Sequence, residues 1–153
     1  MPMLDKPKPR HMLAIRRAAL ADAQAAVGLL HELGYAAEFD AVHARLQRLL
    51  TSENDPVFVA FHADEVVGLM SLHLYEPFYG ELPIGRVTAL VVTERVRGSG
   101  AGAALLTVAE AYFAERRCAR VELTSGERRT AAHAFYQRCG YAPTGRRFVK
   151  QLD

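Results

Sequence analysis

The sequence lacks the features that mark secreted, disulfide-stabilised and membrane-spanning chains. Its two cysteines, Cys118 and Cys139, have no CxxC spacing, which argues against a disulfide framework and a cysteine-based metal site. No apolar run approaches the length of a transmembrane helix, and no signal-peptide pattern opens the chain. We therefore expect a cytoplasmic protein without a membrane partner.

A concentrated block of basic residues is also missing. The net charge is only +2, and the Lys and Arg residues are scattered along the chain. Nucleic-acid binding needs a dense basic footprint, so nucleic acid is excluded as the main partner. With 153 residues, 50% of them hydrophobic and 24% charged, the chain has the composition of one globular domain. We expect residues 1–10, rich in Pro and Lys, to form a loose leader and residues 11–153 to form the domain.

Apolar periodicity predicts an α+β fold, with a mixed, mostly antiparallel sheet of about six or seven strands and helices on both faces. The expected strands cover residues 11–15, 57–61, 66–74, 86–92 and 119–124, with two short closing strands around Tyr141 and over 146–151. The expected helices cover residues 22–33, 38–50, 101–116 and 128–139. The order strand, helix, strand over residues 86–124 predicts a parallel pair with a right-handed crossover.

A glycine-rich turn precedes the third expected helix and carries the strongest chemical signal. Gly98, Gly100 and Gly102 lie within five residues, between an apolar strand and an amphipathic helix. Glycines allow sharp turns and close approach of backbone N–H groups to a ligand, and a helix N-terminus favours an anion. A phosphate-bearing ligand is the expected occupant, and a turn without a ligand is the alternative.

Two nucleotide motifs can be compared with this turn. A P-loop would end in Gly-Lys-Ser/Thr, whereas here the helix continues with Ala103. The spacing Gly98-x-Gly100-x-x-Ala103 matches a relaxed dinucleotide fingerprint, with Glu122 downstream as the ribose ligand. The turn comes after three strands and not after the first, and Glu122 lies inside the next expected strand. A dinucleotide-binding oxidoreductase is therefore the weaker alternative.

Two patterns together resemble the GCN5-related N-acetyltransferase (GNAT) family. Arg97-x-x-Gly100-x-Gly102 resembles the family's pyrophosphate-binding signature, and the stretch 132–141, AHAFYQRCGY, resembles its second pattern, A-x-x-F-Y-x-x-x-G-F/Y. They occur in the family's order, and the resemblance extends over residues 15–152. It implies the acyl-CoA N-acyltransferase fold and an acetyl-CoA-dependent N-acetyltransferase acting on a primary amine, without a metal.

The resemblance also implies where the donor binds. The strands 88–93 and 119–125 should splay apart at a bulge and leave a V-shaped gap for acetyl-CoA. The pantetheine arm would pair with backbone at Leu90, Val91 and Val92, and Ser125 and Phe135 would complete the cofactor contacts. The pyrophosphate would bind the main-chain amides of Arg97, Gly98, Ser99, Gly100, Ala101 and Gly102.

By the same resemblance Tyr136 is the general acid that protonates the thiolate of coenzyme A. Its phenol and a thiol have pKa values close enough for an easy transfer. The family's glutamate early in the preceding strand is missing here, so the general base is assigned to Glu81 or to a water relay. The asparagine that often precedes the last helix is replaced by Arg128 and Arg129.

The acceptor amine is left open by the sequence. Acidic and aromatic residues occur in segments 30–39 and 75–82, which would favour a cationic amine with a carbon skeleton to pack against. Aminoglycosides, polyamines, amino-acid derivatives and protein amines all remain candidates. A catalytically silent acyl-CoA-binding module is a further alternative, and the apolar closing strand suggests a homodimer. His73 and His133 have no second ligand at metal spacing.

Overall fold

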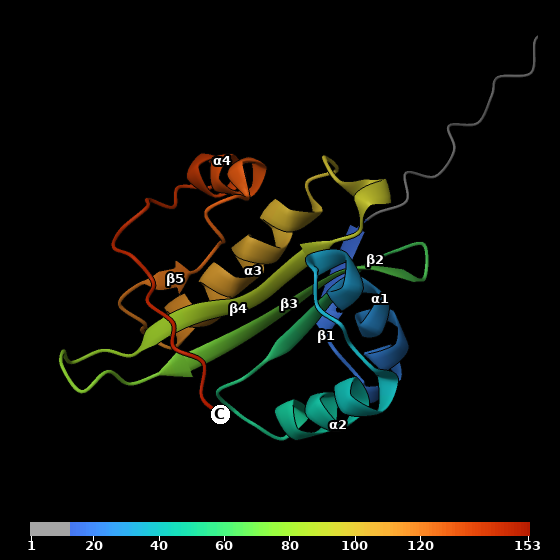
Figure 1. Ribbon diagram of the computed structural model, residues 1–153, viewed down its shortest axis with the longest axis horizontal. Coiled ribbons are helices and arrows are strands. Elements are labelled where there is room, and N and C mark those ends of the chain that lie inside the picture. Colours follow the sequence, from blue (N-terminus) through green and yellow to red (C-terminus); the bar gives the residue numbers. More distant parts are fainter. Residues whose placement is uncertain (1–12) are drawn as a thin grey trace, which may run out of the picture.

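One five-stranded sheet organises the computed structural model, which describes residues 13–153 (Figure 1). Its spatial order, β1-β2-β3-β4-β5, follows the sequence. The strands are β1 (Leu13–Arg17), β2 (Val57–His62), β3 (Glu65–Tyr75), β4 (Ile84–Val92) and β5 (Val121–Leu123). The helices are α1 (Ala23–Leu33), α2 (Phe39–Leu50), α3 (Ala101–Glu115) and α4 (Thr130–Arg138), with short 3₁₀ turns η1 (Leu20–Asp22) and η2 (Glu94–Val96). The expected leader and the first two residues of the expected first strand lie outside the described residues.

The pairing confirms a mixed, mostly antiparallel sheet. Strands β1 to β4 pair antiparallel, and α3 connects β4 to the parallel strand β5. The β2–β3 hairpin turns at Ala63 and Asp64, which both have positive φ, 49° and 67°. Two such residues match the twist of the flanking strands in a two-residue hairpin loop.

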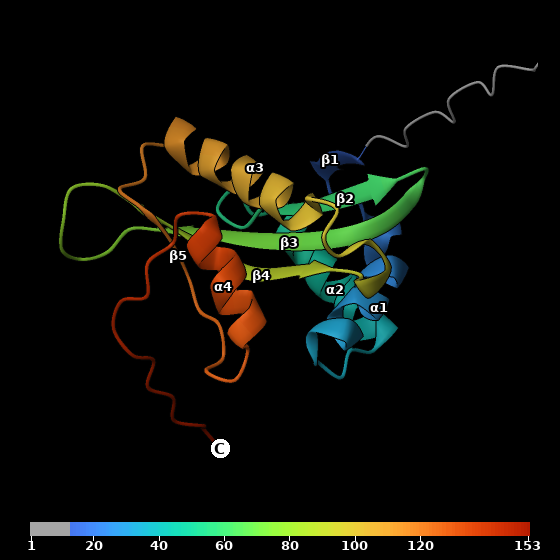
Figure 2. The same cartoon turned by 90° about the horizontal axis from the view of Figure 1, so that it is seen from above.

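The two closing strands expected near Tyr141 and over 146–151 are wrong. In the described residues no strand follows β5, so the sheet has five strands and not six or seven. Residues 146–151 have the composition of a strand, but a strand also needs a partner, and the chain leaves the sheet after α4 (Figure 2). Composition alone did not reveal this missing partner.

The alternation of side chains along the strands creates two cores, one on each face of the sheet. On one face Val57, Val59, Leu69 and Val91 pack with α1 and α2. On the other face Phe58, Ala60, Met70 and Leu72 pack with α3. The helices therefore cover both faces, as the sequence predicts.

Helix α1 begins and ends within one residue of the expected bounds, but the side chain of Asp22, just before the helix, does not cap it. Gly34 ends the helix with φ 106°, the left-handed conformation that favours glycine. Asp22 accepts a hydrogen bond from the backbone N–H of Ala19 (2.7 Å) and forms an ion pair with Arg16 (2.7 Å). The hydrogen bond from Arg16 lowers the pKa of the Asp22 carboxyl despite its burial. Asp22 thus fixes the connection from β1 to α1 and does not cap the helix itself.

Candidate active site

Strands β4 and β5 pair over a short distance and then separate. Gly85 to Val87 pair with Val121 to Leu123, and β4 continues to Val92 with no partner on that side among the residues that the structure describes. Gly85 allows the ring of Phe113 to lie against β4, because a Cβ at this position would be 2.3 Å from the ring. The separation beyond Val87 leaves a backbone edge free to pair with an extended ligand.

A β-bulge in β4 lies at the point where the strands separate. Ser71 on β3 pairs with Ala89 and Leu72 pairs with Val87, so Thr88 is the extra residue. The alternation of β4 changes there: Val87 packs on the α3 side, and so do Leu90 and Val92, whereas Val91 joins the α1–α2 core. Thr88 also hydrogen-bonds through its hydroxyl to Ser71 (2.6 Å). The bulge expected from the family resemblance is thus present, and it directs Leu90 and Val92 toward α3.

The glycine turn is open in front of α3. Gly98 and Gly100 have φ of 82° and 89°, and a Cβ at either position would meet nothing within 4 Å. The N–H of Ala104 donates to Gly100 (2.9 Å), so the N–H groups of Ala101 to Ala103 precede the first intrahelical bond. Arg97 donates from Nε to the carbonyl of Val92 (3.3 Å), which keeps its positive charge beside the turn. Among residues 13–153 no atom lies within 4 Å of a Cβ built at Gly98 or Gly100, and the amides and charge of the turn suit an anion.

Helix α4 lies against the first turn of α3 through an aromatic cluster. Gly102 permits the contact, since a Cβ there would be 3.0 Å from Cζ of Phe135. Tyr136 contacts Phe135 and Tyr141, with ring centroids 5.3 and 6.3 Å apart. Phe135 and Tyr136 are both half-buried and packed against the α3 core.

The phenol of Tyr136 is held in its protonated form at neutral pH. Burial raises its pKa, and the nearby charge of Arg129 only partly opposes the shift. Burial raises the pKa of Tyr141 to about 12. Among the described residues, the hydroxyls of Tyr141 and Ser125 are buried without a hydrogen-bond partner. Ser125 follows β5, at the expected position beside the separating strands.

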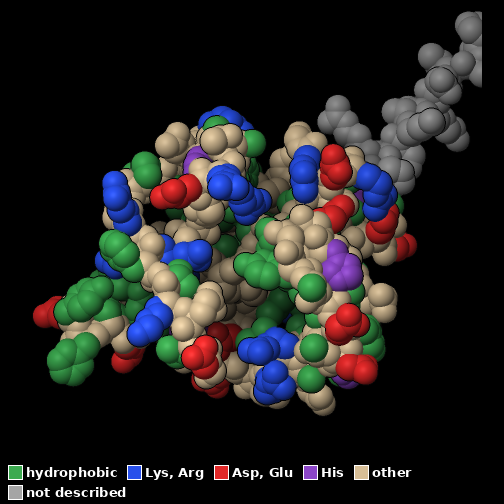
Figure 3. Space-filling view, viewed as in Figure 1, with side chains coloured by type: hydrophobic (Ala, Val, Ile, Leu, Met, Phe, Trp, Pro, Cys, Tyr) green, Lys and Arg blue, Asp and Glu red, His purple; other side chains and the backbone are tan. Residues whose placement is uncertain are grey.

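A row of polar side chains lies on the α1–α2 face of the sheet. Leu72 and Leu74 of β3 pack on the α3 side, so the alternating residues Ser71, His73 and Tyr75 project from the opposite face. His73 Nδ1 lies 2.6 Å from Oδ1 of Asp55. Figure 3 shows this face of the molecule hollowed near its centre, with Lys and Arg side chains around the hollow.

Glu122 of β5 is at the centre of this polar row. It accepts hydrogen bonds from Tyr75 (2.7 Å) and Arg86 (3.3 Å) and is paired with Arg120 (3.4 Å). Burial raises the pKa of Glu122, but these hydrogen bonds and charges outweigh burial and lower it. Arg86 also donates to Thr124. The carboxylate is therefore occupied, and it is not free to bind a ribose as the dinucleotide interpretation requires.

The sequence analysis missed this row, apart from the discarded assignment of Glu122. The alternation of polar and apolar residues over 71–75 is the signal that would have found its β3 members. The links to β4 and β5 depend on strand register, which has no signature in the sequence.

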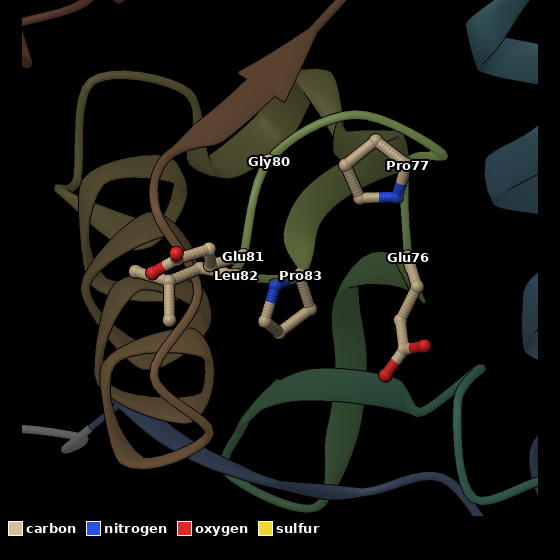
Figure 4. A pocket seen from close by; sticks show the side chains of 6 residues that line it. All are labelled: Glu76, Pro77, Gly80, Glu81, Leu82 and Pro83. Atoms are coloured by element: carbon tan, nitrogen blue, oxygen red, sulfur yellow. The ribbon is translucent and has the colours of Figure 1, made fainter.

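The segments expected to receive the acceptor comprise the end of α1 with the loop to α2, and the β3–β4 loop, and they leave aromatic side chains exposed. Tyr35 is 64% and Phe78 109% exposed. Glu32, at the end of α1, accepts a hydrogen bond from Thr93 (3.0 Å), which ties α1 to the end of β4. The β3–β4 loop encloses a small pocket of about 110 Å³ (Figure 4). The side chains of Glu76 and Glu81, which line it, point in different directions in Figure 4.

Glu81 lies far along β4 from the glycine turn. Its loop is beside the paired end of β4, where Pro83 accepts a hydrogen bond from the N–H of Ala119 (2.8 Å). Figure 1 shows the glycine turn at the other end of β4. The structure therefore brings together the glycine turn, the β4 edge, Phe135 and Tyr136, and places Glu81 apart from the turn.

The two histidines considered for metal binding have other partners. His133 hydrogen-bonds to the carbonyl of Gly126 (2.8 Å) and so braces the connection between β5 and α4. Over residues 13–153, no group of three or more His, Cys, Asp or Glu side chains could hold a metal ion. Within the same range, no helix combines the length and hydropathy needed to cross a bilayer.

Comparison with known proteins identifies the family. A model of the acetyltransferase (GNAT) family matches residues 28–141, which include both motifs and the separating strands. The chain belongs to the GNAT family. Its relatives include an aminoalkylphosphonate N-acetyltransferase of Salmonella typhimurium, 35% identical over 124 residues, covering 81% of this chain and 78% of the relative. An aminoglycoside N(6')-acetyltransferase type 1 of Stenotrophomonas maltophilia is 31% identical over 136 residues, 86% of this chain and 88% of its own.

Solved structures show the same acyltransferase fold. An aminoglycoside N-acetyltransferase in complex with CoA superposes with a TM-score of 0.84 at 17% identity, covering 95% of this chain and 98% of the other. A Bacillus halodurans transcriptional regulator gives a TM-score of 0.86 at 19% identity, with coverages of 92% and 100%. This GNAT protein is therefore an N-acetyltransferase, and the oxidoreductase alternative loses its support.

Proposed function

We propose that this GNAT protein transfers the acetyl group of acetyl-CoA to a primary amine by direct attack of the amine on the thioester. One observation carries the proposal. The glycine turn ahead of α3 is open around Gly98 and Gly100, the N–H groups of Ala101 to Ala103 precede the first intrahelical bond, and the turn adjoins the edge of β4 that has no partner strand in the described residues. A diphosphate with an extended amide-bearing arm fits that combination of a compact anion site and a strand edge.

The donor would contact the chain in two ways. Its pyrophosphate would accept hydrogen bonds from amides between Gly98 and Gly102, with the guanidinium of Arg97 nearby. The expected N–H groups of Arg97 and Ser99 already donate to the carbonyls of Glu94 (3.2 Å) and Val96 (3.1 Å). Its pantetheine arm would pair with the backbone of β4 over Leu90 to Val92, while the buried hydroxyl of Ser125, which has no partner in residues 13–153, supplies a polar group by the slot. Phe135 lies over the first turn of α3 and would border the site.

Tyr136 is the proposed general acid. Burial raises its pKa, so the phenol keeps its proton at neutral pH and can deliver it to the departing thiolate. Glu81 remains the proposed base, with a water relay as its alternative, because Glu122 is ion-paired and has a lowered pKa. The distance of Glu81 from the glycine turn favours transfer through water over direct contact.

The acceptor is proposed to be a small cationic amine. Exposed aromatic residues and acids border the expected entrance, and Glu122 offsets one of the two positive charges of Arg86 and Arg120. The curated relatives are named for two different amines, an aminoalkylphosphonate and an aminoglycoside. The first carries an anionic group and the second carries several positive charges, so the two test the charge preference directly.

The donor test is a thermal-stability and calorimetric titration with acetyl-CoA, longer acyl-CoAs and NAD. Binding of acetyl-CoA, and no binding of NAD, is expected. Binding of NAD in place of CoA would refute the proposed donor site. Weakening of CoA binding by Arg97→Ala, with no change for the neighbouring Arg95→Ala, would place the pyrophosphate at the turn.

The transfer test follows thiol release with an amine panel, corrected for hydrolysis. An aminoglycoside is expected to be acetylated faster than an aminoalkylphosphonate. Acyl-CoA binding without transfer to any amine would favour the catalytically silent module. For the base, Glu81→Gln should lower kcat/KM for the amine, while Glu76→Gln in the same loop serves as the matched control.

A further inference from the structure

A histidine–aspartate pair belongs to the polar row on the sheet face opposite α3. His73 Nδ1 is 2.6 Å from Oδ1 of Asp55, whose other carboxylate oxygen accepts a hydrogen bond from the hydroxyl of Ser52 (2.6 Å). The β3 residues on either side of His73 donate their backbone N–H groups to the carbonyls on either side of Asp55 (3.0 and 2.8 Å). The backbone therefore fixes Asp55 beside the histidine, and Ser52 orients its carboxylate.

The pairing with Asp55 uses only one ring nitrogen of His73. A carboxylate accepts hydrogen bonds, so the proton of the neutral imidazole is on Nδ1 and the lone pair is on Nε2. The ring also stacks on Tyr75, with centroids 5.9 Å apart and 11° between the two planes. An imidazole that a carboxylate and a neighbouring ring hold in one orientation has the arrangement of a general base.

Two charged residues flank His73. Arg86 lies opposite it in the β3–β4 register, but the guanidinium donates to Glu122 (3.3 Å) and to Thr124, both on the side of β5. Arg86 is therefore partnered away from the histidine. Asp55 is in direct contact with the ring, so a proton received by His73 would complete an ion pair with it.

Hydroxyl groups connect this pair to the bulge in β4. Ser71 lies two residues before His73 on the same face of β3, and its hydroxyl is 2.6 Å from that of Thr88, the extra residue of the bulge. Successive residues rise about 3.3 Å along a strand, so Ser71 and His73 are about 7 Å apart. A water that hydrogen-bonds to both side chains can bridge this distance. The two hydroxyls and one water thus form a polar path from the bulge to His73.

The bulge is where the reacting end of the donor is expected. With the pyrophosphate at the glycine turn, the pantetheine arm runs along β4 from Val92 toward Leu90. The thioester at the far end of the arm then lies beside Thr88, where β4 and β5 separate. Leu90 and Tyr136 pack on the α3 side of the sheet. The amine must therefore approach from the opposite face, which carries His73 and is hollowed in Figure 3.

We propose that His73, oriented by Asp55, accepts through this path the proton that the acceptor ammonium loses before it attacks. The role rests on the proposed function and names the residue at the end of its water relay. The neutral amine attacks the carbonyl carbon, the C–N bond forms, and the C–S bond breaks as the sulfur takes the proton of Tyr136. The second N–H proton leaves to water, and Tyr136 is reprotonated from water. The side chain of His73 is 42% exposed, so it returns its proton to solvent, and one proton is released per transfer.

The first test compares two acceptors in single-turnover assays in which chemistry limits the rate. The first acceptor is the amine of the panel with the highest kcat/KM, and the second is its analogue with fluorine next to the reacting amine, neutral at the assay pH. His73→Ala should slow transfer to the first about 100-fold or more and have little effect with the second, which has no proton to lose before attack. His43→Ala, a matched change on α2, should leave both rates unchanged. Equal losses for the two amines, or no loss for the first, would overturn the proposal.

The second test supplies the missing base from solution. Added imidazole should restore part of the rate of His73→Ala, and more basic imidazoles should restore more. Asp55→Asn should also slow transfer, because an amide that donates to Nδ1 moves the ring proton to Nε2. Absence of rescue, or a loss of rate confined to Glu81→Gln, would contradict the role of His73. Acetyl-CoA binding and transfer by the wild type, measured first, distinguish a failure of the proposed function from a failure of the relay, and circular dichroism confirms that each variant is folded.

Discussion

Replacing Gly85 with alanine tests whether close packing at the point where β4 and β5 begin to separate holds the site together. A Cβ at Gly85 would be 2.3, 2.5 and 2.5 Å from three ring carbons of Phe113. Phe113 is 1% exposed and surrounded by the α3 core, so its ring has no free space to enter. The backbone of β4 must therefore move away from α3.

The expected cost follows from overpacking of a rigid core. Such insertions cost about 1–3 kcal/mol, and the severity of these contacts places Gly85→Ala near about 3 kcal/mol. For a domain of this size that change lowers Tm by roughly 6 to 12 °C. Urea unfolding followed by circular dichroism, at a fixed protomer concentration, measures the change in free energy of unfolding.

Two comparisons isolate the cause. Gly28→Ala lies in α1 with nothing within 4 Å of its Cβ, so helix propensity should stabilise the protein by up to about 1 kcal/mol. Phe113→Leu should cost less in the Gly85→Ala background than in the wild type, because the ring that meets the new methyl group is gone. If Gly85→Ala unfolds within about 0.5 kcal/mol of the wild type, the reasoning from close packing is refuted.

Three further predictions concern the donor site and the β1–α1 connection. Tyr136→Phe should lower kcat by about 100-fold or more, with little change in the KM for acetyl-CoA. Deprotonation of Tyr136 should not lower the wild-type rate until the pH exceeds the usual phenol pKa of about 10. An unchanged kcat in Tyr136→Phe, when chemistry limits the rate, would remove Tyr136 as the acid. Gly100→Ala should weaken CoA binding, measured by calorimetry. The left-handed backbone conformation costs about 1–2 kcal/mol for a residue with a side chain, so the turn must change shape. Gly34→Ala, at a glycine with a similar φ of 106° outside the turn, should leave CoA binding unchanged. Asp22→Asn should cost about 2 kcal/mol at pH 7. The lowered pKa of Asp22 means that its stabilisation is complete above about pH 4 and is lost as pH falls through the folded-state pKa, so urea unfolding of the variant should depend less on pH in that range.

The sequence predicted the elements whose signals are local. The glycine turn, the helix that follows it and the end of α1 at Gly34 were all expected, because glycine positions and apolar periodicity act over a few residues. The separation of β4 and β5 came from the family resemblance and not from the residues themselves.

Features that depend on strand register were not predicted. The carboxylate of Glu122 was considered only as a dinucleotide ligand, whereas register brings it next to Arg86 and within reach of Tyr75. The closing strand over 146–151 was expected from composition, which cannot show whether a neighbouring strand is present. Glu81 was selected from its position in the sequence, and the loop that carries it proved to lie at the other end of β4 from the glycine turn.

The extra residue at Thr88 makes the length of β4 more important than its composition. Deletion of this residue would leave the following side chains on their present sides, because Val87 and Ala89 already pair with the neighbouring residues Leu72 and Ser71, and it would remove the local bend of the strand. Insertion of one residue after Ala89 would instead direct Val91 at α3 and Leu90 at α1, where each would meet a space shaped for its neighbour. Sequence drift in this segment should consequently be tolerated as exchanges among apolar residues, whereas a deletion should straighten β4 and an insertion should disrupt both cores.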